Sequence, residues 1–506
     1  MRLETGHQLY EGFEQVLETT QECPVDTEYN LPDYCADIQK ILKCIVTPEI
    51  TSAVVMGDSV SVEGSAEIRV LYLDAKGDCV RGFDTKKEFQ FMVRLNDSPE
   101  NAAVQVRPWV QHLTCRAMNA RRVDMHITLG FAVSVFGVRR TEMIGSVTGA
   151  PVETKCVQYP VSKAVGCCSH AFILEENLPL QNGKPTIETI LRRSVQYRVD
   201  HVQASGDEIR FSGRACVEIL YRSFADSSLP EHMLFEIPFE ETVSCTDADE
   251  LCTVSAVFTG GECSIQPRED SVGEYTIFNI YLKPSFVLKV FKPDTVTLVN
   301  DAFATKGLLA AKYGNAVLEH LEPVQMRQIR VREVLRIPEG ELERVLDLWC
   351  EGLTVSDFTE RDVHMLRGKF MLCLLYRSKE KRIVYTERML DFTETGAETE
   401  GGKSITAGEI TAARFVITDP TALECTVELQ LQEQVRILHS VRALESVQLD
   451  DDAQEETCCA AVYYADAGEQ LWDIAKRYRA PVASIRNHNH GISDTIEAAR
   501  PLIICR

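Results

Sequence analysis

Residues 394–408 (ETGAETEGGKSITAG) are the stretch whose residue types come nearest to a nucleotide-binding loop. A phosphate-binding loop needs a glycine, four residues and then Gly-Lys-Ser, so that backbone N–H groups cradle the phosphate oxygens. Here Gly396 precedes Gly402 by one residue too many, and Glu398 and Glu400 would repel a phosphate. We therefore interpret the segment as a flexible insertion and expect no nucleotide site there.

Two short motifs contain residue types that bind metal ions, His488-x-His490 and Cys167-Cys168-x-His170. A zinc site needs further ligands at a suitable spacing, and neither motif has a second half of this kind. We interpret both motifs as surface loops and expect no metal and no other cofactor. The linear sequence also contains no Gly-x-Ser-x-Gly turn and no Ser/His/Asp or Cys/His set that can be assembled. We therefore expect no catalytic residues and no enzyme activity.

The composition limits the class of protein. A chain of 506 residues is too long for one hydrophobic core, so we expect several domains. The formal net charge of −23 argues against a nucleic-acid partner or an anionic membrane surface. The N-terminal segment is charged throughout, and no window approaches the roughly 18 apolar residues of a membrane span. The 18 cysteines are scattered without a Cys-x-x-Cys pair, which is typical of reduced thiols in a cytosolic protein.

One strand-like stretch is written three times, as VEGSAEIRVLY from residue 62, FSGRACVEILY from residue 211 and LRGKFMLCLLY from residue 366. Each copy has a glycine and, eight residues later, a tyrosine. A leucine lies 22 residues before each glycine, and an aspartate lies six residues before it. The repeat positions are Gly64 and Tyr72, Gly213 and Tyr221, and Gly368 and Tyr376, with Leu42, Leu191 and Leu346 and with Asp58, Asp207 and Asp362.

The repeat predicts whole β domains. The glycines are 149 and 155 residues apart, which is far longer than one turn of a solenoid. Within each copy apolar and polar residues alternate, as in a strand with one buried face, and a glycine inside a strand marks a bulge, a bend or a close approach of the backbone. The aspartates are better interpreted as turn residues than as catalytic acids. We expect a mainly β fold of three sandwich-like or barrel-like domains, residues 1–150, 151–300 and 301–440.

These units resemble the SPOCS domain of bacterial spore-coat proteins. The resemblance rests on a hydrophobic-Pro pair, a segment of the type Asp-Ile-x-x-Ile-Leu, the strand with its glycine, and the Leu-Tyr pair. In the first copy these features are Leu31-Pro32, DIQKIL (residues 37–42), Gly64 and Leu71-Tyr72. The resemblance covers about residues 20–440 in three copies. The third copy is the most diverged, since Arg361 replaces a glycine.

The pattern changes after residues 441–459, which we expect to be an acidic linker. Residues 460–506 predict a small domain of strand, helix, helix and strand. The signals are an apolar stretch at 461–465, helical spacing of Leu471, Ile474, Ala475 and Tyr478, a proline at 481 and a second apolar stretch at 502–504.

The C-terminal segment resembles a LysM domain. Gly468, Leu471 and Trp472 match the start of the family motif, and Asn489 and Asp494 match its later part. In the family the binding groove lies between the loop before the first helix and the loop after the second. The resemblance therefore implies a groove for a protein or a glycan, formed by Gly468, Glu469 and Gln470 with Ile492, Ser493 and Asp494. Ile492 and nearby exposed loop residues are the expected binding anchors, whereas Trp472 is better explained by packing of the helix pair.

Three SPOCS-like domains followed by one LysM-like domain resemble the spore-coat assembly proteins of clostridia. The resemblance implies a non-enzymatic scaffold in the mother cell, at the surface of the forespore. Its LysM-like domain would dock the coat morphogenetic ATPase, and other spore-coat proteins would be further partners. The alternative is a glycan-binding protein that uses the LysM groove on peptidoglycan.

Overall fold

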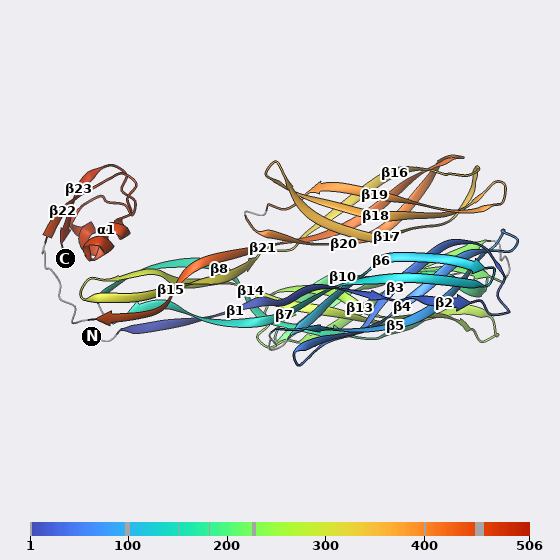
Figure 1. Ribbon diagram of the computed structural model, residues 1–506, viewed down its shortest axis with the longest axis horizontal. Helices are drawn as coiled ribbons and strands as arrows, with labels where there is room; N and C mark the ends of the chain where they lie inside the picture. Colours follow the sequence, from blue (N-terminus) through green and yellow to red (C-terminus); the bar gives the residue numbers. More distant parts are fainter. Residues whose placement is uncertain are drawn as a thin grey trace.

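The computed structural model describes residues 3–96, 102–149, 151–181, 183–224, 229–398, 401–450 and 460–505. Within these ranges the chain is an elongated, mainly β molecule, whose two short helices belong to a module at the C-terminal end (Figure 1). None of the helices in the described ranges is long and apolar enough to span a lipid bilayer. The predicted mainly β fold class is confirmed.

The strands before the C-terminal module form three successive sets of seven within the described ranges, called units 1, 2 and 3. Unit 1 contains β1 (Glu4–Pro24), β2 (Thr27–Asn30), β3 (Ile38–Met56), β4 (Ser59–Asp74), β5 (Val80–Arg94), β6 (Ala103–Asn119) and β7 (Arg122–Thr148). Unit 2 contains β8 (Val152–Ala171), β9 (Leu174–Pro179), β10 (Ile187–Ser205), β11 (Glu208–Ser223), β12 (Pro230–Ser244), β13 (Thr253–Glu269) and β14 (Tyr275–Ala304). Unit 3 contains β15 (Leu308–Leu321), β16 (Gln325–Arg336), β17 (Leu342–Glu360), β18 (Val363–Ser378), β19 (Ile383–Thr395), β20 (Lys403–Asp419) and β21 (Ala422–Asp450).

Each unit is a sandwich of two antiparallel sheets. In unit 1 the first sheet has the order β3-β4-β5, and the second is centred on β7, with β1 and β2 along one edge and β6 along the other. Units 2 and 3 repeat this topology, with β10-β11-β12 facing the β14 sheet and β17-β18-β19 facing the β21 sheet. The sheets stay open, so the units are sandwiches and not closed barrels.

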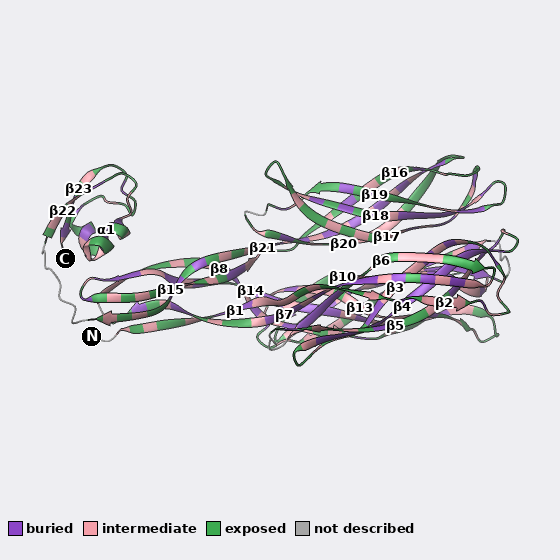
Figure 2. Ribbon diagram, in the orientation of Figure 1, coloured by how far each residue is buried: buried purple, intermediate pink, exposed green. Residues whose placement is uncertain are grey.

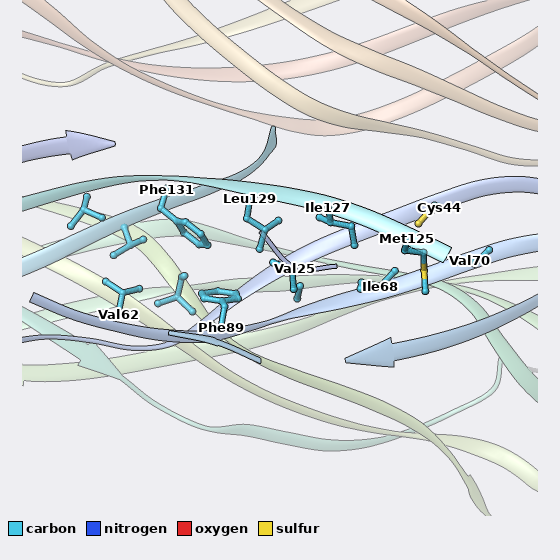
Figure 3. Close-up of a cluster of buried hydrophobic side chains, with 14 of the residues drawn as sticks. Val25, Cys44, Val62, Ile68, Val70, Phe89, Met125, Ile127, Leu129 and Phe131 are labelled. Carbon is cyan, nitrogen blue, oxygen red and sulfur yellow. The ribbon is translucent and has the colours of Figure 1, made fainter. Parts of the chain in front are cut away.

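The core of each sandwich comes from the alternating apolar residues of the two facing sheets. In unit 1, Val62 and Ile68 of β4 lie opposite Leu129 of β7 (Figure 3). The rings of Phe89 and Phe131 meet across the core with their centroids 4.9 Å apart. Colouring by burial shows the same arrangement over the whole molecule, with buried positions concentrated along the sandwich strands (Figure 2).

The repeated glycine has a steric cause. A Cβ atom on Gly64 would lie 2.2 Å from the carbonyl oxygen of Glu49 and 2.6 Å from the ring of Phe89. The preceding strand also shifts its register by one residue at this point, between Ile50 and Ser52. The other two units repeat the cross-strand pair of glycine and phenylalanine, as Gly213 with Phe239 and Gly368 with Phe392. The glycine therefore leaves room for an aromatic ring beside a bulge.

The Leu-Tyr pair of the repeat points to both faces of its strand. The tyrosines are at most 1% exposed inside their own sandwiches. Each tyrosine hydroxyl donates a hydrogen bond to a backbone carbonyl, and the three pairs are Tyr72 to Ala36, Tyr221 to Pro185 and Tyr376 to Glu339. Because neighbouring side chains alternate between faces, the leucines before them point outward.

The outward leucines of all three units meet in one buried cluster. It contains Leu71, Leu220 and Leu375 of the Leu-Tyr pairs together with Leu42, Leu191 and Leu346. Around this junction β10 contacts β5, β17 contacts β12 and β3 contacts β19, so that each unit touches the next in cyclic order. The three repeats therefore pack about an approximate threefold axis.

Three long antiparallel strand pairs, which we call arms, extend beyond the sandwiches as a stalk (Figure 1). We define the stalk as residues 4–14 paired with 137–148, 152–163 paired with 292–304, and 308–321 paired with 436–450. Apolar side chains from all three arms fill its interior, namely Tyr10, Met143, Val161, Val296, Leu298, Leu318, Val441 and Ala443. The stalk thus continues the threefold packing of the units.

The expected linker at residues 441–459 is partly wrong. Strand β21 runs to Asp450, and Leu308 of β15 pairs with this last residue. Val441, Ala443 and Leu444 are buried in the stalk. In residues 441–450 buried or half-buried apolar residues alternate with exposed ones. The acidic and other polar residues of the exposed face made this alternation difficult to recognise in the sequence. Residues 451–459 lie outside the described residues.

The C-terminal module comprises residues 460–505. Its antiparallel strands are β22 (Ala460–Ala465) and β23 (Arg500–Cys505), and its helices are α1 (Leu471–Tyr478) and α2 (Val482–His488). Leu471 and Ile474 of α1, Ile485 of α2 and Leu502 of β23 form the small core. The strand, helix, helix, strand order agrees with the sequence prediction.

We expect Leu220→Ala to lower the free energy of unfolding by about 2–5 kcal/mol, because it leaves a cavity at the junction of the three units. The control is Leu234→Ala on the adjacent strand, where the side chain is 50% exposed and the expected loss is within about 0.5 kcal/mol. Urea unfolding monitored by tryptophan fluorescence would compare the two variants. Equal losses would contradict the role of the leucine junction.

Candidate functional site

The two loops predicted to form a groove lie side by side at one end of the module. The Leu471 N–H donates to the Asp494 carbonyl at 2.8 Å, and the Gly468 N–H donates to the Ile496 carbonyl at 2.7 Å. The Ile496 N–H donates back to the Glu469 carbonyl at 2.9 Å. The structure therefore brings Gly468, Glu469 and Gln470 together with Ile492, Ser493 and Asp494.

Glu469 holds its own loop in place. Its carboxylate accepts hydrogen bonds from the Tyr463 hydroxyl at 2.7 Å and from the Asp466 N–H at 3.0 Å. These two hydrogen bonds, with a smaller contribution from Arg477, lower the pKa of Glu469. Glu469 is thus a structural acceptor, and its carboxylate is already engaged within the module.

The remaining polar residues of the loops form a hydrogen-bonding rim. The Gln470 amide donates to the Thr495 hydroxyl at 3.0 Å, and the Ser493 hydroxyl donates to the Thr495 carbonyl. Asp494 forms an ion pair with Arg486, yet its side chain is 81% exposed. Such a rim can bind a peptide or a sugar through hydrogen bonds, because it offers amide, hydroxyl and carboxylate groups.

The expected anchor Ile492 is half-buried. Its side chain packs against the core of the module, which includes Leu471 and Ile496. A short loop in so small a module draws its single large apolar side chain toward the core. Only part of Ile492 is therefore open to a partner.

Trp472 makes a contact that sequence reasoning missed. Its ring lies partly on the core of the module, as expected, but it also meets Phe303 of β14 at a centroid distance of 5.0 Å. Its indole N–H donates to Asp301 at 2.8 Å. The local sequence holds no signal for this contact, because the two partners lie 171 positions apart.

A cavity of about 870 Å³ lies between the three units. Equivalent segments of β3, β10 and β17 and of β6, β13 and β20 contribute to its lining. The charged side chains that reach across the units are paired, as in Lys43 with Glu351 at 3.1 Å, Arg192 with Asp347 at 2.6 Å and Arg193 with Glu67 at 2.6 Å. We interpret these ion pairs as ties between the units and not as a charged ligand site.

The Gly-Lys-Ser segment has a structural role. The fully buried carboxylate of Glu433 accepts hydrogen bonds from the Ala397 N–H at 2.9 Å and from the Ser404 hydroxyl at 3.0 Å. The Ala397 N–H and the Ser404 hydroxyl thus bind a carboxylate of the chain itself. Strand β19 runs to Thr395 and Lys403 begins strand β20, so the expected flexible insertion is wrong for residues 394–395 and 403–408. Residues 399–400 lie outside the described residues.

The surface-loop interpretation holds for only one of the metal-like residues. His490 lies in an exposed turn, whereas His488 ends helix α2 and contacts the Ser484 carbonyl. Cys167, Cys168 and His170 belong to strand β8. Such short motifs cannot be separated from regular elements by spacing alone. In the part of the chain that the structure describes, no three His, Cys, Asp or Glu side chains gather as a metal site.

Comparison with known proteins identifies the repeats. The family model described as SipL, SPOCS domain, matches residues 37–118 and 186–266. These segments correspond to β3–β6 of unit 1 and β10–β13 of unit 2, and they cover about a third of the chain. No curated protein and no solved structure matches the chain. The SPOCS resemblance is confirmed for these two units, and it indicates a protein related to sporulation.

The C-terminal module should lose stability as the pH falls through the lowered pKa of Glu469. An unfolded glutamate has a pKa of about 4.3, so the stabilisation is complete above this value and is lost below it. Glu469→Gln should flatten this part of the pH profile, whereas Glu497→Gln, at an exposed position of the same module, should not. Hydrogen exchange of α1, compared between variants at each pH, measures the difference. Parallel profiles for all three proteins would refute the role of Glu469.

Proposed function

We propose that this SipL-like protein, with its SPOCS domains, is a non-enzymatic scaffold in the assembly of the bacterial spore coat. The match of the SipL family model to units 1 and 2 is the observation that carries the proposal. The protein would work in the cytoplasm of the mother cell, at the forespore surface. Its three units would display surfaces to other spore-coat proteins, while the shared leucine junction holds these surfaces at fixed positions.

The C-terminal module is the part that we propose to dock the coat morphogenetic ATPase, a protein of the SpoIVA type. Two features support this role. The loops of the expected groove are joined by backbone hydrogen bonds, so the rim is preorganised, and Ser493 and Asp494 remain exposed on it. A few well-placed anchors are enough for a protein interface, because a small number of residues contributes most of the binding energy.

Removal of the C-terminal module should abolish most of the binding to the ATPase. The measurement compares how much purified ATPase is recovered by the immobilised full-length protein and by an immobilised chain ending at Asp450. We expect the shorter chain to bind the ATPase about tenfold more weakly, or weaker still. The truncation keeps every strand of the three units, so their melting temperature serves as the folding control. Equal recovery would refute the docking role.

A second candidate function is binding of peptidoglycan through the same rim. It is favoured by the amide and hydroxyl groups of Gln470, Ser493 and Thr495, since such groups hydrogen-bond to sugar hydroxyls. Titration of the full chain with muropeptides by calorimetry discriminates between the two functions. If the protein is a scaffold and does not bind glycans, we expect the muropeptide titration to give no saturable heat of binding. Saturable binding that is lost with Gln470→Ala and Asp494→Ala would favour the glycan function.

A further inference from the structure

The C-terminal module is seated on the end of the stalk through one face of helix α1. Asp301 of β14 accepts the indole N–H of Trp472 at 2.8 Å and contacts the Lys476 ammonium with both carboxylate oxygens, at 2.6 and 2.7 Å. Phe303 packs edge-on against the Trp472 ring, with a centroid distance of 5.0 Å. Farther along, the Arg479 guanidinium donates to the Gly307 carbonyl at 3.2 Å.

The stalk is shaped to receive this helix. Asp301 follows a bulge in β14, where the register with β8 shifts between Val299 and Asp301. A bulge turns the next side chain in a new direction. The Tyr313 hydroxyl, from β15, donates to Asp301 at 2.9 Å and fixes the carboxylate from the other side. Burial raises the pKa of Asp301, but Lys476, Trp472 and Tyr313 outweigh this effect and lower it, so the carboxylate stays charged.

Comparison of the three arms shows that only the β8–β14 arm carries this pair of contact residues. The other two arms have a bulge at the equivalent place, and the residue that follows it is Ser146 in β7 and Ser446 in β21. Two residues further on, where β14 has Phe303, the other arms have Thr148 and Gln448. An acid and an aromatic ring therefore replace polar neutral residues in the arm that meets the module.

The contact involves few side chains, chiefly Trp472, Lys476 and Arg479 of the module. In its ion pair the Lys476 side chain is 42% exposed and the Asp301 side chain 15% exposed. An ion pair that is partly exposed to water contributes little, and an aromatic pair contributes about 0.5–1.5 kcal/mol. The module stays seated because its tether makes the contact intramolecular, so that a competing surface of matching chemistry can displace it.

We propose that the Trp472–Lys476 side of α1 is a protein-binding surface for an acidic, aromatic-bearing partner, and that Asp301 and Phe303 occupy it in the resting chain as an intramolecular stand-in. The stalk shows what the partner must offer, namely a carboxylate for the indole N–H and the ammonium group, and a ring for the indole face. The contact is then an autoinhibitory latch. The identity of the partner rests on the docking role proposed above, whereas the latch does not.

Asp301→Ser tests the latch with the residue that units 1 and 3 carry at this position. We expect the emission of Trp472 to shift to longer wavelength, because the indole becomes exposed to water. The same substitution in a Trp472→Phe background should leave the spectrum unchanged, as should the control Asp294→Asn at an exposed position of β14. An unchanged spectrum of Asp301→Ser would overturn the latch.

Binding of the coat ATPase tests the partner surface. Asp301→Ser should bind it about fivefold or more tightly than the natural chain, the lower end of typical coupling between sites, and an added Trp472→Ala should reverse this gain. Unchanged or weaker binding by Asp301→Ser would overturn autoinhibition. If the chain without its module binds as well as the natural chain, the docking role fails together with the partner surface, and the spectra still decide the latch.

Discussion

The architecture depends on the alternation of side chains along one strand. In each unit the central strand of one sheet places a tyrosine in the core of its own sandwich and the preceding leucine on the outside. The inward residue stabilises a unit, and the outward residue joins it to the other two. The Leu-Tyr dipeptide thus stabilises each unit and also joins the three units together. Because every unit needs both contacts, the dipeptide occurs in all three copies.

Charged residues make the junction specific. The position after the repeat leucine is Lys43 in unit 1, Arg192 in unit 2 and Asp347 in unit 3, so that three equivalent residues differ in sign. Arg192 pairs with Asp347 at 2.6 Å, and both side chains are at most 3% exposed. A buried pair of this kind adds little net stability, but an unpaired partner would be costly. We infer that these charges fix which unit lies beside which.

The three copies also differ in residue type at one equivalent position of the stalk. The three arms share a bulge and carry serine, aspartate and serine at the position after it. The arm with the aspartate holds the C-terminal module. The repeated residues thus build the framework, while single differences between the copies give each unit its own neighbour.

The sequence by itself determined the repeat, the mainly β class, the Gly and Leu-Tyr positions and the strand, helix, helix, strand order of the module, because these depend on local spacing and periodicity. Resemblance to a family also predicted that the two loops of the module lie next to each other. Tertiary structure alone decided that Leu71, Leu220 and Leu375 share one cluster, that residues 441–450 belong to the stalk and that Trp472 contacts Asp301. These outcomes depend on contacts between residues that lie far apart in the chain. The alternation of residues along a strand shows which face is apolar, but it does not show which other element covers that face.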